Sequence, residues 1–321
     1  VLGGYASEVS SIHKEADSLV RNSTEETFRR YRTSVVYAAD GSVISKLNDQ
    51  GASYYLKRDE IPQSVIDAVV CMEDQRFYQH RGVDFRALVR AAKSLIENRK
   101  ITQGGSTITM QLARNVFLTQ EKTWQRKVEE IFIAQNLEKK YTKDQILEFY
   151  LNNIYYGNGY YGIGAAGRGY FDSGVDELDL SQIAFLCAIP NNPTVYDPVT
   201  HMDHAIERRD RILGKMRDDG KITQMAYAAA VVENITLKRP EAMEKNNYVE
   251  TYAYYCATRA LMEQAGFVFQ YQFATEDERE AYERAYSESY SDCQKRLYTE
   301  GYQIYTCLLY TSDAADDLTR V

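Results

Sequence analysis

The sequence is poor in residues that interrupt helices and in residues that build small metal or redox motifs. It contains 5 prolines in 321 residues, and three of them, Pro190, Pro193 and Pro198, lie in one segment. The 5 cysteines include no Cys-x-x-Cys pair, which excludes a zinc or redox motif of that type. Because proline rarely interrupts the chain, the composition favours a mainly α protein.

Long apolar stretches are also missing. No run approaches the roughly 18 apolar residues that a membrane helix needs. The nearest run, residues 183–189, is short enough to be a buried core helix. The chain starts at Val1 without an initiator methionine, so an N-terminal signal or anchor can lie outside this sequence.

Charge of one sign dominates the whole chain but not every part of it. The formal net charge of −8 argues against an overall nucleic-acid binder. Between Arg99 and Lys143, however, nine Lys and Arg stand against four Glu, a local balance of +5. Such a basic zone suits a substrate that carries phosphates.

The pattern of apolar residues predicts a small hairpin followed by a helical domain. Residues 33–37 and 42–45 read as strands joined by the tight turn at Asp40-Gly41. Apolar residues then recur every three or four positions in six segments: 64–72, 84–97, 123–138, 143–154, 180–189 and 204–217. Beyond residue 237, a charged, tyrosine-rich helical stretch resembles a linker or an insertion, and residues 301–306 read as another strand.

The first segment with catalytic potential is residues 73–84, Glu-Asp-Gln-Arg-Phe-Tyr-Gln-His-Arg-Gly-Val-Asp. On one helix Glu73, Phe77 and His80 would share a face, and Gly82 would end the helix. A carboxylate beside an aromatic ring is partly desolvated and becomes a usable proton acceptor. Taken alone, the segment is more typical of a solvated helix end.

The second segment, residues 103–115, opens with Gly104-Gly105 and runs into an apolar periodic stretch. Ser106 or Thr107 can cap the start of that helix, and such a terminus favours anions. It is not a Walker loop, because the Gly-Lys-Ser/Thr is absent. By itself it fits an ordinary capped helix equally well.

The third segment places a charged pair at the head of an apolar stripe. Arg126 and Glu130 are four residues apart, and the same face continues to Ile133 or Ala134 and to Leu137. A merely solvated pair would more often lie opposite that stripe. Spacing alone does not choose between Glu129 and Glu130 as a functional carboxylate.

Two further segments favour structural explanations. Residues 143–157 predict a helix explained largely by core packing, followed by a glycine-rich turn. His201-Met-Asp-His204 lacks a clear third ligand, so no metal is expected there.

Taken in order, these segments resemble the five motifs of the family 51 peptidoglycan glycosyltransferases, the domain found in class A penicillin-binding proteins. The resemblance rests on Glu73-Asp-x-x-Phe-x-x-His-x-Gly82, Gly104-Gly-Ser-Thr-Ile-Thr-x-Gln-Leu-Ala-x-Asn115, Arg126-Lys-x-x-Glu130, Lys143-x-x-Ile-Leu-x-x-Tyr-Leu-Asn152 and Arg208-Arg-x-x-Ile-Leu213. It covers about residues 50–235. Five motifs in order at matching spacing are far more specific than any one of them.

The resemblance implies a mainly α, lysozyme-like fold with a small β hairpin on its N-terminal side. It implies four segments: an N-terminal juxtamembrane helix and hairpin at 1–45, the glycosyltransferase domain at 46–236, a linker towards a transpeptidase domain at 237–306, and a tail at 307–321. The tail resembles a translated sequencing adapter, so it is set aside from fold reasoning.

The implied reaction is polymerisation of lipid II, a disaccharide-peptide on a polyprenyl pyrophosphate, by inverting transfer. Glu73 matches the general base that deprotonates the GlcNAc 4-hydroxyl, and Glu130 matches the second carboxylate, near the pyrophosphate. The other motif positions are expected to bind substrate: Asp74, Phe77, His80, Ser106, Thr107, Gln111, Arg114, Asn115, Arg126, Lys127, Asn152, Arg208 and Arg209.

Two departures from the family pattern concern the second motif. Met110 stands where the family usually has Gln, and Arg114 stands where it has Lys. Arg114 keeps the positive charge but changes the donor geometry. These differences bear on substrate fine-tuning and not on reaction class.

The resemblance also implies surroundings and partners. No cofactor is required, although a divalent cation such as Mg²⁺ at the pyrophosphate is compatible. The expected partners are lipid II, the growing glycan chain, the membrane surface and other cell-wall synthesis proteins, but no nucleic acid. The expected location is the extracytoplasmic face of a bacterial membrane, with an N-terminal anchor helix outside this sequence.

Other interpretations remain at this stage. A lysozyme-like hydrolase or lytic transglycosylase explains Glu73 but not the basic third motif. A non-catalytic glycan-binding module of the envelope would not need Glu73. Residues 84–103 mix apolar and basic side chains and fit either an interfacial membrane helix or core packing.

Overall fold

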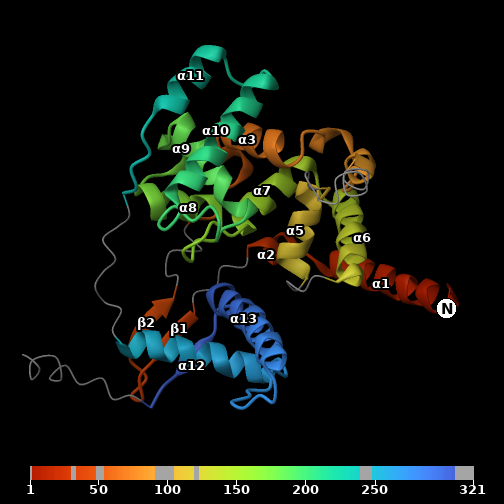
Figure 1. The fold of residues 1–321 in the computed structure, drawn as a ribbon, viewed down its shortest axis with the longest axis vertical. Helices are drawn as coiled ribbons and strands as arrows, with labels where there is room; N and C mark the ends of the chain where they lie inside the picture. The colour runs from red at the N-terminus through yellow and green to blue at the C-terminus, as the bar shows by residue number, and fades with distance from the viewer. Residues whose placement is uncertain are drawn as a thin grey trace, which may run out of the picture. The chain divides into compact units, whose positions relative to one another are not determined.

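The computed structural model describes residues 2–29, 34–47, 54–90, 105–118, 123–238 and 248–307 (Figure 1). Helices account for most of these residues, and three short strands form one sheet. The predicted mainly α class with a small β hairpin is therefore confirmed. None of the helices in the described ranges is long and apolar enough to cross a membrane.

The chain divides into two compact units, each built from two separate stretches of sequence. The first unit joins Val1–Arg29 to Tyr54–Pro240, and the second joins Arg30–Ser53 to Glu241–Val321. The grouping differs from the predicted segments, because the helix and the hairpin of residues 1–45 belong to different units. Residues 308–321 of the predicted tail lie outside the described part of the chain.

The described residues of the first unit form helices joined by loops, with one isolated β-bridge between Tyr155 and Tyr161. Its helices are α1 (Leu2–Asn22), α2 (Glu25–Phe28), α3 (Gln63–Glu73), α5 (Ile108–Phe117), α6 (Trp124–Lys140), α7 (Lys143–Asn153), α8 (Ile163–Phe171), α9 (Leu180–Ala188), α10 (Met202–Asp218) and α11 (Gln224–Val232), with 3-10 turns η2 (Arg58–Glu60), η3 (Phe77–Gln79), η4 (Val175–Glu177) and η5 (Ile189–Asn191). Five of the six periodic segments coincide with α3, α6, α7, α9 and α10. Of the sixth, residues 85–90 are helical and residues 91–97 lie outside the described ranges.

Side-chain caps explain where several helices begin. Thr107, Thr123, Thr142 and Thr223 each accept a hydrogen bond from a backbone amide in the first turn of α5, α6, α7 and α11 respectively, and Asp179 does the same for α9. Each cap satisfies an amide that has no partner within its helix. Of the two candidate caps for α5, Thr107 holds the position.

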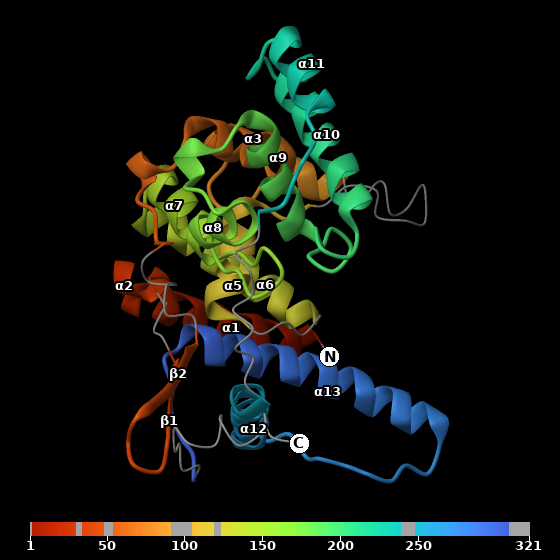
Figure 2. The same cartoon turned by 90° about the vertical axis from the view of Figure 1, so that its left-hand side faces the viewer.

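The core of the first unit surrounds α3, α5 and α7. Helix α3 packs against α9 and α10, while α5 packs between α6 and α7 (Figures 1 and 2). Leu112 of α5, Ile66 of α3 and Leu147 of α7 are fully buried members of one apolar cluster. Helices α3, α5 and α7, which carry Glu73, Gln111 and Asn152, are therefore fixed by one shared core.

Helix α1 packs along α6 through Ala16 and Val20, which are buried. Just after α1, Phe28 stacks on Phe149 of α7 with ring centroids 4.0 Å apart. Buried stacked rings of this kind contribute more than their apolar area alone. The N-terminal helix is thus part of the main helical unit.

The second unit combines a sheet with two long helices, α12 (Tyr248–Gln264) and α13 (Glu276–Thr299). Strands β1 (Ser34–Tyr37) and β2 (Val43–Leu47) form the predicted antiparallel hairpin, and β3 (Gln303–Tyr305) pairs with β1 in parallel. Gly41 has φ +83° in the turn, a conformation that glycine adopts without strain. The strand predicted at 301–306 is confirmed.

Helices α12 and α13 have an apolar core of their own, formed by Leu261, Met262, Cys293 and Leu297. Tyr286 and Tyr290 pack against it. The predicted linker is therefore a folded unit, because residues far back in the sequence supply the sheet that completes it.

The segment after Glu73 is not the continuous helix that the spacing predicts. Helix α3 ends at Glu73, the backbone of Asp74 is non-helical at φ −159°, and Phe77 lies in a separate 3-10 turn. Phe85 and Val89 farther on are exposed, and the rest of the segment predicted to contact membrane, residues 91–103, lies outside the described ranges.

Gly82 is required by a close approach of two backbones and not by a helix end. A Cβ atom at Gly82 would lie 2.6 Å from the carbonyl oxygen of Ala134 in α6, and the φ of Gly82 is +86°. Any larger residue would push the loop away from α6 and also strain its own backbone.

Gly82→Ala is expected to destabilise the protein more than Gly220→Ala. Gly220 also has a positive φ, +70°, but a Cβ there would meet nothing within 4 Å. Both changes therefore incur the left-handed strain of about 1–2 kcal/mol, and only Gly82→Ala adds overpacking of about 1–3 kcal/mol. Urea denaturation measures both, and equal losses would contradict the close approach.

Candidate active site

The carboxylate of Glu73 is held by side chains from two other helices. Its Oε1 accepts a hydrogen bond from Nη2 of Arg208 in α10 at 3.0 Å, and its Oε2 accepts one from Nε2 of Gln111 in α5 at 3.0 Å. The side chain is 15% exposed. Glu73 is thus fixed at the end of a buried helix while part of it still reaches solvent.

Tyr150 fixes the orientation of the Gln111 amide. The hydroxyl of Tyr150 donates to Oε1 of Gln111 at 3.2 Å, so the NH₂ group of Gln111 is directed at Glu73. Burial, and then the charge of Glu73, raise the pKa of Tyr150 well above its usual value. The phenol therefore keeps its proton and remains a donor.

Cys187 forms an apolar wall near the same carboxylate. Burial, and then the charge of Glu73, raise the pKa of this thiol to about 12. A thiol that stays protonated is a poor nucleophile. Sequence reasoning did not identify Cys187 as a neighbour of Glu73, because nothing in its local pattern differs from a core residue.

The second carboxylate, Glu130, lies on α6 and is 1% exposed. Its Oε2 accepts a hydrogen bond from Nζ of Lys127 at 2.6 Å, and its Oε1 lies 3.4 Å from Nε of Arg126. Glu129 instead is half-buried, and burial, followed by the charge of Glu15, raises its pKa. The geometry therefore selects Glu130 as the carboxylate that organises the two cations.

Helix α5 connects the two carboxylates. Nζ of Lys127 also donates to Oγ of Ser106, just before α5, at 2.8 Å, whereas Gln111 farther along α5 reaches Glu73. Lys127 is 37% exposed at its side chain. A helix start and a partly exposed ammonium together provide a site for an anionic group.

Arg114 and Asn115 follow Gln111 by three and four residues on α5, so they share its face. Both are half-buried. The charge of Arg114 acts on Tyr150, which also hydrogen-bonds Gln111. These two motif residues are therefore directed towards the neighbourhood of Glu73. Met110 faces the other way and is fully buried.

In the described ranges, the side chains around Glu130 form no set of metal ligands supplied by the protein alone. Both oxygens of Glu130 are directed at the cations Lys127 and Arg126. In the described ranges no group of three or more His, Cys, Asp or Glu could hold a metal ion. His201 and His204 stack with ring centroids 5.6 Å apart and form no ligand set with a third residue in that part of the chain.

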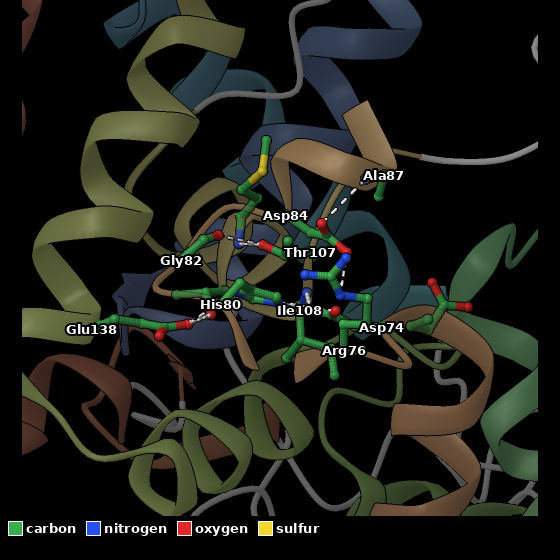
Figure 3. A network of polar contacts seen from close by, with 12 residues as sticks. Asp74, Arg76, His80, Gly82, Asp84, Ala87, Thr107, Ile108 and Glu138 are labelled. Carbon is green, nitrogen blue, oxygen red and sulfur yellow. Dashed lines mark hydrogen bonds and ion pairs between the residues drawn. The ribbon is translucent and has the colours of Figure 1, made fainter. Parts of the chain in front are cut away.

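Asp74 and His80 belong to a buried polar network next to the site (Figure 3). The carboxylate of Asp74 lies 2.9 Å from Nε2 of His80 and accepts the backbone amide of Ile108 at 3.1 Å. Thr107 donates to the carbonyl of Gly82 at 2.6 Å. The network ties the start of α5 to the end of α3.

The same network continues to α6 and α7. Glu138 lies 3.9 Å from Nδ1 of His80 and accepts hydrogen bonds from Thr109 and Lys143 at 2.7 Å each. The ammonium of Lys143 lies 4.1 Å from the ring centre of Phe77, which is fully buried. Burial lowers the pKa of Lys143, and the bond to Glu138 opposes that shift.

Part of the expected substrate-binding set lies in this buried network. Asp74, Phe77, His80 and Thr107 are buried and contact other residues of the protein. Asn152 is also buried, and its side chain bonds both the amide and the carbonyl of Leu56. The spacing of a motif cannot distinguish a residue that touches substrate from one that supports it.

Arg209 likewise has a structural role, unlike its neighbour Arg208. Its guanidinium donates to Oγ of Ser181 and to the carbonyls of Val231 and Glu233, at the end of α11. It is 2% exposed. Consecutive residues on a helix point about 100° apart, so only Arg208 reaches Glu73.

The fold and the site together define a class of helical enzyme domain. One partly exposed carboxylate is held by two hydrogen-bond donors, and cationic side chains that can bind an anion lie beside it. The family model described as Transglycosylase matches residues 40–217. The chain therefore belongs to the transglycosylase family, as the sequence motifs predicted.

Two penicillin-binding proteins are similar to the chain over stretches longer than the one that the family model matches. The chain is 37% identical over 302 residues to penicillin-binding protein 4 of Bacillus subtilis, covering 94% of this chain and 48% of that protein. It is 36% identical over 273 residues to penicillin-binding protein 1A of Escherichia coli, covering 85% of this chain and 28% of that protein. The chain thus spans about half the length of the first relative and less of the second.

Asp74→Asn is expected to lower the free energy of unfolding by about 2–4 kcal/mol, because the new NH₂ group would face a donor inside a buried network. Asp67→Asn in α3 is the matched control. Asp67 pairs with Lys221, whose side chain is 44% exposed, so the control should change stability by less than about 1 kcal/mol. Thermal or urea unfolding measures both, and similar losses would show that the Asp74 network does not stabilise the site.

Proposed function

We propose that this chain polymerises lipid II into glycan strands as a peptidoglycan glycosyltransferase. The 4-hydroxyl of the acceptor GlcNAc attacks C1 of the lipid-linked MurNAc with inversion. The new bond joins O4 to C1, and the bond from C1 to the pyrophosphate oxygen breaks. The observation that carries the proposal is the pairing of a partly exposed Glu73, held by Arg208 and Gln111, with a cationic group organised by Glu130.

Glu73 acts as the general base in this proposal and takes the proton of the attacking hydroxyl. Both of its side-chain partners are donors, which is the arrangement that an ionised carboxylate accepts. They also fix its direction, so that a substrate hydroxyl can meet a carboxylate that is already in place. The environment separates Glu73 from Asp74, whose oxygens are taken up by His80 and Ile108.

The cationic group stabilises the leaving pyrophosphate. Lys127 and Arg126 are held by Glu130, Ser106 lies beside Lys127, and Arg114 adds a third cation on α5. Fixed positive charges placed where negative charge develops lower the barrier without reorganisation during the reaction. Glu130 has a buried carboxylate with two cationic neighbours, so its role here is to position them and not to transfer a proton.

The proposed location is a membrane surface, on the extracytoplasmic face of a bacterial membrane, and the proposed partners are lipid II and the growing glycan. The lipid-linked nature of the proposed substrate supports this location. Exposed Phe85 and Val89 beside Arg86 and Arg90 provide an apolar and basic surface suited to lipid headgroups. Other cell-wall synthesis proteins are further proposed partners.

The rival functions explain less of the site. A hydrolase or lytic transglycosylase cleaves polymer and has no need for a pyrophosphate site, whereas the cations Arg126 and Lys127, with Ser106, gather around Glu130 in an arrangement suited to one. A non-catalytic glycan-binding module has no need for a carboxylate fixed by two side-chain donors. Polymer synthesis uses both features.

Glu73→Gln is expected to reduce polymerisation of labelled lipid II in detergent by about 100- to 10,000-fold, the usual contribution of a general base. Glu207→Gln is the matched control, since Glu207 is exposed on α10 next to Arg208 and the change removes the same charge. The control should retain at least half of the rate. Polymer formation by Glu73→Gln at the wild-type rate would overturn the mechanism.

Glu130→Gln and Glu129→Gln test the second carboxylate. Glu130→Gln should lower kcat by about 100-fold, because Lys127 and Arg126 lose the charge that positions them, and fixed electrostatic groups typically contribute that much. Glu129→Gln should change kcat by less than about twofold. Equal effects of the two changes would show that Glu130 has no special position, and circular dichroism checks that both variants are folded.

A further inference from the structure

A loop residue outside the five motifs lies against the guanidinium that holds Glu73. The Cζ atom of Arg208 lies 5.0 Å from the ring centre of Tyr196, within the range of a cation–π interaction. Tyr196 is half-buried in the loop between η5 and α10. The aromatic ring, the guanidinium and the carboxylate of Glu73 thus form a continuous series of contacts.

Arg208 has little else to fix its direction. It is 6% exposed, and its Nη2 donates to Glu73. Its Nε is buried and finds no hydrogen-bond partner among the described residues. A guanidinium is planar, so a single hydrogen bond at Nη2 leaves the group free to rotate about that bond. An aromatic ring packed against its face restricts this rotation and so sets the orientation of the guanidinium plane.

The loop itself is built to hold the ring in place. The backbone amide of Tyr196 donates to the carbonyl of Asn192 at 2.9 Å. The carboxylate of the next residue, Asp197, accepts hydrogen bonds from the amide of Val199 and from the hydroxyl of Thr200. These contacts define the backbone on both sides of Tyr196.

The glycine-rich turn of the fourth motif anchors that loop from the other side. Asn158 donates to Oδ1 of Asp197 at 2.8 Å and to the hydroxyl of Tyr170 at 2.9 Å. Asn158 has φ +50°, a left-handed conformation that Asn tolerates better than most residues. Burial alone would raise the pKa of Asp197, but the hydrogen bonds from Val199, Asn158 and Thr200 hold it below its usual value.

We infer that Tyr196 is a positioning residue for the transfer reaction: its ring holds the guanidinium of Arg208 in the plane that directs Nη2 at Glu73, and the Asn158–Asp197 contact holds the ring. This inference rests on the proposed role of Glu73 as general base. Tyr196 acts through Arg208 and does not contact the reacting atoms.

The same helix offers a matched comparison. Arg217 of α10 lies 4.4 Å from the ring centre of Tyr227, but it pairs with the neighbouring Asp218 and its side chain is 34% exposed. Within the described ranges its side chain donates to Asp218 and not to Glu73 or to another proposed active-site residue. Tyr227→Leu therefore removes an equivalent ring without disturbing the site.

The first experiment reads the guanidinium directly by ¹⁵N NMR, independently of activity. Wild type and Tyr196→Phe should show separate, slowly exchanging Nη–H signals for Arg208, identified by their loss in Arg208→Lys. Tyr196→Leu should show averaged signals, because rotation is no longer hindered. Unchanged signals in Tyr196→Leu would overturn the inference. If Tyr196→Leu does not fold, Tyr196→Met provides a flexible side chain of closer size for the same comparison.

The second experiment measures lipid II polymerisation by the same variants. Tyr196→Leu should lower kcat by about 3- to 10-fold, the range that a cation–π contact supports, with KM changed by less than about twofold. Tyr196→Phe and Tyr227→Leu should match wild type. A raised KM with unchanged kcat would mean that Tyr196 binds substrate, which overturns a positioning role.

The two measurements separate failure of this inference from failure of the proposed function. If wild type makes no polymer, the proposed function fails, and if Glu73→Gln polymerises as fast as wild type, the general-base role of Glu73 fails; in both cases the NMR comparison still decides whether Tyr196 orients Arg208. If Glu73→Gln is inactive and Tyr196→Leu equals wild type in both measurements, only this inference fails.

Discussion

The site depends on the burial of the Asp74 carboxylate. A buried carboxylate is costly unless hydrogen bonds replace its water, and Asp74 obtains them from His80 and from the amide of Ile108. The second bond joins the end of α3 to the first turn of α5. Gln111, one turn farther along α5, is thereby brought to Glu73, the residue that precedes Asp74 in the chain. A buried carboxylate thus determines where Glu73, the proposed general base, meets Gln111.

Carboxylates that look alike in sequence acquire different roles from their surroundings. Glu73 keeps part of its surface in solvent and meets two donors, whereas Asp74 is enclosed. Glu130 is enclosed as well, but its neighbours are cations that themselves reach solvent, so it acts on the site through them. The same principle separates acid from base in many enzymes that use pairs of carboxylates. Here it separates Glu73, the proposed proton acceptor, from Asp74, which ties α3 to α5, and from Glu130, which holds two cations.

Helix α10 shows how one helix serves both the site and the fold. Arg208 points to Glu73 and Tyr196, while Arg209 points to Ser181 and the end of α11. Both arginines are almost fully buried, and each bonds partners from distant segments. The loop before α10 carries Tyr196, and Asn158 ties this loop to the glycine-rich turn. The position of Arg208 therefore depends on this loop as well as on Glu73.

The sequence by itself determined the helices, the hairpin and the chemical groups of the site. Thr107 and Thr142 cap helices through bonds to residues three positions away, and Gly41 allows its turn without help from elsewhere. The motif spacing likewise identified Glu73, Gln111 and Arg208. Only the tertiary structure decided that α3 stops at Glu73, that the hairpin joins α12 and α13, and that Glu130 rather than Glu129 faces the cations. The first two outcomes depend on contacts between distant segments, such as the hydrogen bond from the amide of Ile108 to Asp74 and the pairing of β1 with β3, which no local pattern specifies.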